Sequence, residues 1–187
     1  MITTISKQIS RYLVVNGADA SDEEVLAYGA ECFLNEVIST ALLIIIGILT
    51  NHVLELLIWS VSFCLLRVNL GGLHAASHGW CITAGTLSGA SSLMLSPFLL
   101  QHIIFAIVLT FVAAVTTCII GPVPHKNKQH VQIKRKEIKK KVIIVVMLEC
   151  ITSVIFYFVS PVIATYIASG LILATLLAVA GLLWNPR

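Results

Sequence analysis

Long apolar stretches alternate with short polar connections along most of the chain. Six such stretches lie at about residues 33–50, 52–66, 80–100, 102–120, 142–160 and 162–184. Most of them approach the ~20 residues that a helix needs to cross a bilayer. A helix satisfies all of its backbone polar groups internally, which an apolar segment in lipid requires. The pattern therefore predicts an all-α, polytopic membrane bundle of about six transmembrane helices.

The first sixteen residues show a different hydrophobic periodicity. Ile5, Ile9 and Leu13 recur every four residues among polar side chains. This spacing predicts an amphipathic helix over residues 1–16 that lies on the membrane surface and does not cross it. The run Ser21–Glu24 fits a capping box, with its serine as the N-cap of the next helix.

Two prolines mark expected helix boundaries. Pro97 and Pro161 stand next to predicted turns, near residues 97–101 and 160–161. Because proline lacks the backbone N–H that a helix interior uses, both are expected at helix ends and not inside a helix.

Composition agrees with a membrane protein and excludes a soluble globule. Of the 187 residues, 58% are hydrophobic and 11% are charged, whereas soluble domains average about 25% charged residues. The length leaves room for one integral membrane domain over residues 1–187. No cleavable leader is expected, because no apolar core of signal-peptide length precedes the first stretch. The five cysteines form no paired motif, which favours reduced thiols over a disulfide framework or a zinc ribbon.

Basic residues are concentrated in one connection, residues 121–141. It holds eight of the twelve lysines and arginines, and such loops stay in the cytoplasm. Counting six crossings outward from it places both termini and the connection after the second stretch on the same side, where Lys7, Arg11, Arg67 and Arg187 also lie. The charge therefore has a membrane explanation, and nucleic-acid binding is disfavoured.

The connection after the second stretch carries the candidate chemistry. A cysteine nucleophile needs a base and histidine is its usual partner, so His74 and Cys81 are a candidate pair. On one straight helix, seven residues would separate them by about 10.5 Å, far beyond hydrogen-bond reach. The helix must therefore be broken, and Gly71, Gly72 and Gly79 supply permissive backbone around the segment.

Other interpretations of these residues remain open. His74 and His78 could solvate a cytoplasmic loop, or bind zinc together with Cys81 in an H-x3-H-x2-C pattern. The zinc pattern lacks the glutamate that acts as base in H-E-x-x-H enzymes. Acidic residues in or near apolar stretches are candidates for a third member beside the pair. They are Glu36, Glu55 and Glu149, of which the last two also motivate the alternative function, a small peptide or ion transporter.

The same segment contains a longer motif. The pattern is R-x3-G-G-x-H-A-x5-C, formed by Arg67, Gly71, Gly72, His74, Ala75 and Cys81. It resembles the signature of the accessory gene regulator protein B (AgrB) family of quorum-sensing peptidases. The run Gly121–Lys128 resembles a loop of that family, which is usually acidic at the position of Pro124. Size, the amphipathic N-terminus and the six-span layout are similar too, so the resemblance covers nearly the whole chain.

The resemblance implies an enzyme and its substrate. Cys81 and His74 would cleave a short signalling propeptide near its C-terminus through a thioester acyl-enzyme. An internal cysteine or serine of the peptide would then close a thiolactone or lactone ring. The expected partners are an amphipathic AgrD-like propeptide and membrane lipids, with no cofactor or metal, and a homodimer is compatible with the sequence. The implied location is the bacterial cell membrane, with the active site at the cytoplasmic face.

The resemblance also assigns residues to substrate binding. They are Arg67, Gly71, Gly72, Lys126 and Lys128. Besides its role in topology, the basic connection could attract an acidic segment of the propeptide.

Overall fold

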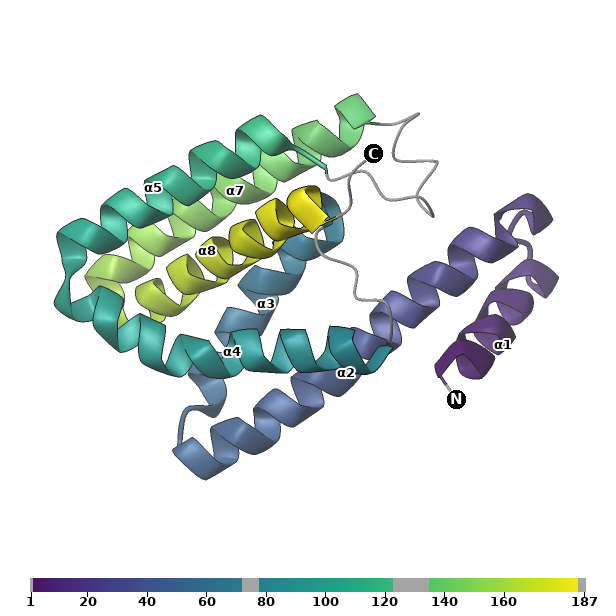
Figure 1. The fold of residues 1–187 in the computed structure, drawn as a ribbon, viewed down its shortest axis with the longest axis horizontal. Coiled ribbons are helices and arrows are strands. Elements are labelled where there is room, and N and C mark those ends of the chain that lie inside the picture. The colour runs from purple at the N-terminus through teal and green to yellow at the C-terminus, as the bar shows by residue number, and fades with distance from the viewer. Residues whose placement is uncertain (1, 72–77, 123–134, 185–187) are drawn as a thin grey trace.

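The structure is a computed structural model that describes residues 2–71, 78–122 and 135–184. Within these ranges the chain is helical apart from short turns and contains no strand (Figure 1). The all-α fold predicted from the apolar stretches is thereby confirmed.

Seven α-helices and one 3-10 turn make up the described chain. They are α1 (Ile2–Val15), the 3-10 turn η1 (Ala20–Asp22), α2 (Glu23–Thr50), α3 (Val53–Leu70), α4 (His78–Gln101), α5 (Ile103–Ile120), α7 (Arg135–Val159) and α8 (Pro161–Trp184).

Five helices of the described chain are long and apolar enough to cross a bilayer. They are α2 together with η1, α3, α5, α7 and α8, and many large hydrophobic side chains are exposed along the bundle. A water-soluble protein rarely exposes so much apolar surface, so the chain is a multi-pass membrane protein. α4 has 24 residues but is rich in Gly, Ser and Thr, and it is not among the five. The sixth crossing therefore stays a prediction.

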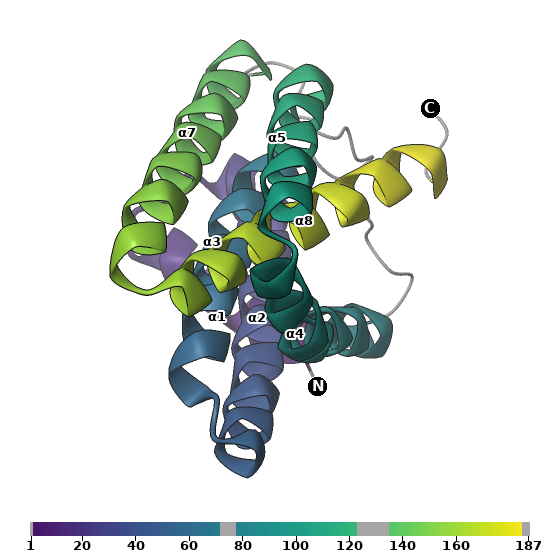
Figure 2. The same cartoon turned by 90° about the vertical axis from the view of Figure 1, so that its left-hand side faces the viewer.

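Helix α8 lies at the centre of the bundle. It packs against α3, α4, α5 and α7 (Figures 1 and 2). On α3, Trp59 and Phe63 stack with ring centroids 4.7 Å apart, and each is 1% exposed. At Gly170 of α8, an added Cβ would lie 2.7 Å from Ser62 Oγ and 3.2 Å from Phe63 N. The absence of a side chain therefore lets α3 and α8 approach closely.

Helices α2 and α4 run side by side in the same direction. Ser39 Oγ on α2 donates to the Ile82 carbonyl on α4 at 3.3 Å. Further along, a Cβ added to Gly89 of α4 would lie 2.5 Å from the Leu43 side chain of α2. The residue numbers of the contacting pairs rise together along the two helices, which shows that α2 and α4 are parallel. This packing fixes the N-terminal half of α4, which carries Cys81, against α2.

Helix α1 packs on the first half of α2 through small polar side chains. Ser6 and Ser10 are fully buried, and Ser6 Oγ donates to Glu31 Oε1 of α2 at 3.3 Å. Ile5 and Leu13 stay exposed, at 38% and 40%. The predicted extent of this amphipathic helix is confirmed to within a residue at each end, and its apolar residues are available to lipid.

The predicted capping box is wrong. The chain makes the 3-10 turn η1 before α2, and Asp19 accepts hydrogen bonds from Ser21 N–H and Ser21 Oγ, both at 2.8 Å. Ser21 is therefore a donor within a turn, and the N-cap of α2 is Asp22. Because of the additional turn, α2 begins at Glu23, one residue later than a cap at Ser21 would place it.

The two prolines behave differently. Pro161 is the first residue of α8, as predicted. Pro97 lies inside α4, four residues before Gln101, so its prediction as a helix boundary is wrong. Its missing N–H deprives the Leu93 carbonyl of the usual helix partner. Membrane helices tolerate such a loss because neighbouring groups satisfy the freed carbonyl.

Candidate functional site

Helix α3 ends where the sequence requires a helix break. Its last residue is Leu70, and Gly71 follows with a φ of 75°, a value that favours glycine. Helix α4 begins at His78. α3 therefore does not continue through Gly71 into α4 as one uninterrupted helix.

Several predicted site residues lie outside the described part of the chain. They are Gly72, His74, Lys126 and Lys128. The pairing of His74 with Cys81 and the roles of the other three in substrate binding therefore stay predictions.

Cys81 lies in the first turn of α4, with a free and partly buried thiol. Tyr28 of α2 is within electrostatic range of Cys81, and its hydroxyl is hydrogen-bonded to the Cys32 thiol one turn further along α2. Arg67, in the last turn of α3, is also within range of Tyr28. Two members of the sequence motif on different helices, Cys81 and Arg67, therefore have Tyr28 of α2 as a common neighbour.

The Arg67 side chain lies over an aromatic ring of its own helix. Its guanidinium carbon is 5.6 Å from the Phe63 ring centroid, a distance suited to a cation–π contact. Glu36 of α2 and Cys64 of α3 lie within electrostatic range of the guanidinium. A guanidinium fixed at this end of the bundle can pair with a peptide carboxylate or donate a hydrogen bond to a peptide carbonyl.

The three acidic candidates occupy different places. Glu36 is partly buried on α2, near Arg67. Glu55 stands in the first turn of α3, with Oε1 3.5 Å from His52 Nδ1, and the helix separates it from Arg67 by about 18 Å of rise. Glu149 is 6% exposed on α7. The structure therefore places Glu36 at the motif end of α3 and Glu55 at the opposite end.

His78 makes polar contacts that the sequence motif does not include. Its Nε2 is 3.1 Å from Thr3 Oγ1 on α1, and its Nδ1 is 3.3 Å from Asn35 Nδ2 on α2. These partners are 75 and 43 residues away in sequence, so no local pattern could have indicated them. A zinc ion bound at His78, the alternative interpretation, would have to replace one of these bonds.

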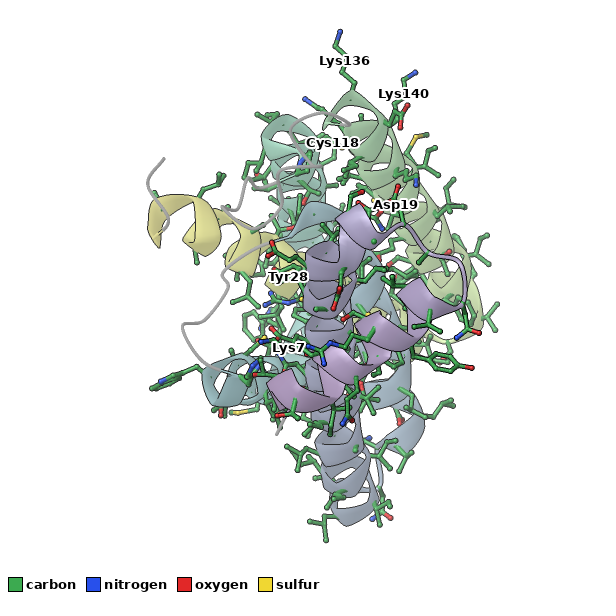
Figure 3. The ribbon with its side chains drawn as sticks, turned by 90° about the vertical axis from the view of Figure 1, so that its right-hand side faces the viewer. Lys7, Asp19, Tyr28, Cys118, Lys136 and Lys140 are labelled. Atoms are coloured by element: carbon green, nitrogen blue, oxygen red, sulfur yellow. The ribbon has the colours of Figure 1, made fainter. Side chains whose placement is uncertain are left out.

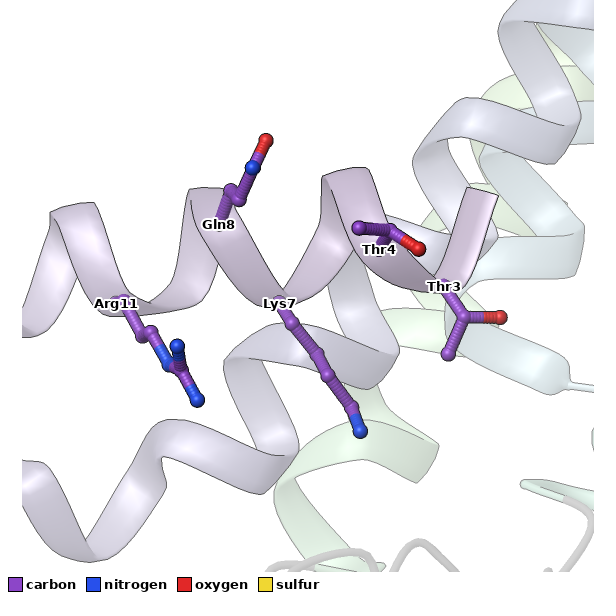
Figure 4. A pocket seen from close by; sticks show the side chains of 5 residues that line it. All are labelled: Thr3, Thr4, Lys7, Gln8 and Arg11. Carbon is purple, nitrogen blue, oxygen red and sulfur yellow. The ribbon is translucent and has the colours of Figure 1, made fainter. Parts of the chain in front are cut away.

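A polar pocket of about 250 Å³ lies on the N-terminal helix. Its lining consists of Thr3, Thr4, Lys7, Gln8 and Arg11 (Figure 4). None of these residues offers a thiol, imidazole or carboxylate, so the pocket does not supply a nucleophile–base pair. It is a cationic feature of the surface helix.

The described part of the basic connection belongs to the start of α7. Lys136 and Lys140 extend from the free end of this helix (Figure 3), and both are exposed. Positive charge at a helix N-terminus opposes the helix dipole, so these lysines do not stabilise α7. Their position favours the topological role instead.

Comparison with known proteins shows which family the sequence is similar to. The family described as Accessory gene regulator B matches residues 6–179. Over 170 residues the chain is 28% identical to a "Putative AgrB-like protein" of Clostridium perfringens (strain SM101 / Type A). It is 27% identical, also over 170 residues, to "Putative AgrB-like protein 2" of Clostridium perfringens (strain 13 / Type A). Both alignments cover 84% of this chain and 79% of the relative.

No solved structure matches the chain. The family match nevertheless extends from α1 into α8 and covers all or part of every helix described above. The chain therefore belongs to the accessory gene regulator B family and takes part in accessory gene regulator quorum sensing.

Proposed function

We propose that this protein is a membrane-embedded cysteine endopeptidase that cleaves a short signalling propeptide near its C-terminus. Cys81 is the nucleophile and His74 its base. The observation that carries the proposal is the position of Cys81, a partly exposed thiol in the first turn of α4 that has Tyr28 as a neighbour, as Arg67 does, and that follows the helix break at Gly71. Cys81, Arg67 and Gly71 belong to the motif that resembles the family signature.

The reaction proceeds through a thioester. His74 accepts the Cys81 thiol proton, and the sulfur attacks the carbonyl carbon of the scissile amide. The C–N bond then breaks, the proton passes from His74 to the leaving amine, and the N-terminal part of the propeptide stays on Cys81. An internal thiol or hydroxyl of the peptide displaces Cys81, which regains a proton, and closes a thiolactone or lactone ring. Exclusion of water from the site favours ring closure over hydrolysis.

The start of α4 supports this chemistry electrostatically. The first four N–H groups of a helix lack partners within the helix, and those of α4 belong to residues 78–81. Such donors stabilise negative charge that develops on a substrate carbonyl oxygen, as an oxyanion hole does. In the proposed mechanism, a nucleophile in this first turn uses these N–H groups as donors for the charge that its attack creates.

The test is propeptide cleavage by the purified protein in detergent, followed by mass spectrometry. Cys81→Ala should lower turnover on the order of a thousandfold or more, because no other group replaces the thiol. With wild type, a hydroxylamine-labile acyl adduct should form on Cys81. Cys118→Ala is the control, since this cysteine packs against the core on α5. Full turnover by Cys81→Ala, or activity lost with a chelator and restored by zinc, would overturn the proposal.

A further inference from the structure

His78 connects three helices at the turn that carries Cys81. Its ring contacts Thr3 of α1 through Nε2 and Asn35 of α2 through Nδ1. An amide nitrogen only donates, so Asn35 donates to Nδ1, and the neutral ring then carries its proton on Nε2 and donates to Thr3 Oγ1. Both ring nitrogens are therefore used for contacts between helices.

Cys81 stands between two fixed points on α4. It follows His78 by three residues, so the two side chains lie on neighbouring sides of the same turn. Its other neighbour, Ile82, is held by the bond from Ser39 Oγ of α2 to its carbonyl, at 3.3 Å. Bonds to α1 and α2 therefore fix the backbone on both sides of the nucleophile.

We propose that His78 is a positioning residue that holds the first turn of α4, and with it Cys81, against α1 and α2. This inference rests on the proposed function, since it assigns His78 to the support of that nucleophile. Attack on an amide requires the sulfur to approach the carbonyl carbon at a set distance and angle, and small displacements are costly in rate. The bond to Thr3 also makes the surface helix α1 part of this support.

The contact to α1 does not depend on one bond. Ser6, one turn after Thr3, is buried and donates to Glu31 of α2, so α1 is seated independently of His78. Loss of the Thr3–His78 bond should therefore remove one of the bonds that position the start of α4 and leave α1 in place. This separates the effect on Cys81 from a general loosening of the fold.

A double-mutant cycle on the Thr3–His78 hydrogen bond tests the proposal, with propeptide turnover as the measurement. Thr3→Val removes the hydroxyl, and His78→Asn keeps a group near Asn35 but no longer reaches Thr3. Each change should lower kcat by about tenfold to a hundredfold with little change in KM and in the thermal midpoint. The double variant should be no slower than the slower single variant, and Thr3→Ser should restore the wild-type rate. Thr4→Val is the matched control, because Thr4 is an exposed neighbour with no bond to His78.

A second measurement does not depend on peptidase activity. In a chain whose other four cysteines are replaced, the rate of Cys81 alkylation by a maleimide should change several-fold in Thr3→Val and His78→Asn, and should stay unchanged in Thr4→Val. If Cys81→Ala still cleaves propeptide, the proposed function fails, whereas the alkylation rates still decide the positioning role. Wild-type alkylation rates and wild-type kcat in both variants would overturn that role. So would a loss in His78→Asn as complete as that in Cys81→Ala with Thr3→Val unaffected, since His78 would then be the base.

Discussion

The turn between α1 and α2 depends on one carboxylate. Asp19 accepts two hydrogen bonds from Ser21, one from its backbone N–H and one from its hydroxyl. These bonds hold the pKa of Asp19 below its ordinary value of 3.8, and the backbone bond contributes most. A carboxyl with a lowered folded pKa stabilises the fold above its ordinary pKa. It loses this contribution as the pH falls through the lowered value.

Replacing Asp19 should therefore matter at neutral pH and not in acid. Asp19→Ala should exchange the amide hydrogens of Ala20–Asp22 faster than wild type at neutral pH, as measured by hydrogen–deuterium exchange in detergent. Well below pH 3.8 the difference should shrink, because wild-type Asp19 is protonated there. Asp19→Asn is the control, since its amide oxygen accepts from Ser21 at any pH. Equal exchange in wild type and Asp19→Ala at neutral pH would refute the role.

At the residue scale, the sequence predicted the helix break after α3 better than it predicted contacts between distant residues. The motif named Arg67 and Cys81, which the structure brings to one end of the bundle, and the break at Gly71 followed from the rise of a helix. The Asp19 cap was missed because the pattern does not show whether a 3-10 turn precedes the helix. The contacts of His78 were missed because their partners are distant in sequence.

Between whole helices, small residues decide how closely neighbours pack. At Gly170 the nearest atoms to an added Cβ include the backbone nitrogen of Phe63, which cannot rotate away. At Gly29 of α2 an added Cβ would meet nothing within 4 Å. The two glycines therefore play opposite parts, one as a contact between α3 and α8 and the other as a weak helix former on an open surface.

Alanine at these two positions should shift stability in opposite directions. Gly170→Ala should destabilise the protein by about 1–3 kcal/mol, because α3 and α8 must separate to admit the methyl group. Gly29→Ala should leave stability unchanged or raise it by up to about 1 kcal/mol, since alanine loses less entropy in a helix. Unfolding by sodium dodecyl sulfate, followed by circular dichroism in mild detergent, measures both. A stable Gly170→Ala variant would show that α3 and α8 do not pack at this distance.

At the element scale, the apolar pattern predicted each helix, but not every boundary. Each of the six stretches lies within one helix or extends one residue beyond it. The prediction of a helix end at Pro97 was wrong because a proline that would end a helix in water is tolerated within a membrane helix. The Gly, Ser and Thr content of α4, which lowers its hydropathy, also supplies close contacts with α2, at Gly85 against Ser39 and at Gly89 against Leu43. In this helix, close packing on α2 favours small residues, whereas burial in the bilayer favours more apolar ones.

For the whole molecule, the orientation depends on whether α4 crosses the membrane. Its 24 residues give about 36 Å of rise, enough for a hydrocarbon core of about 30 Å. Its two ends lie at opposite sides of the bundle, as do those of α5 and α7 (Figure 1). If α4 crosses, the start of α7 and the end of α3 share one side. If it does not, the basic start of α7 lies opposite Arg67, against the distribution of positive charge.

Thiol labelling of single-cysteine variants in intact cells decides between these arrangements. We expect an impermeant maleimide to label Thr50→Cys and Gln101→Cys from outside, since both residues are exposed at the last positions of α2 and α4. Lys136→Cys, at the start of α7, should react only after the cells are permeabilised. If α4 does not cross, Gln101→Cys and Lys136→Cys exchange behaviour while Thr50→Cys stays accessible. If the whole bundle is inverted, only Lys136→Cys reacts in intact cells. That result would move Cys81 and its proposed chemistry to the outer face, where a propeptide made in the cytoplasm could not reach it before export.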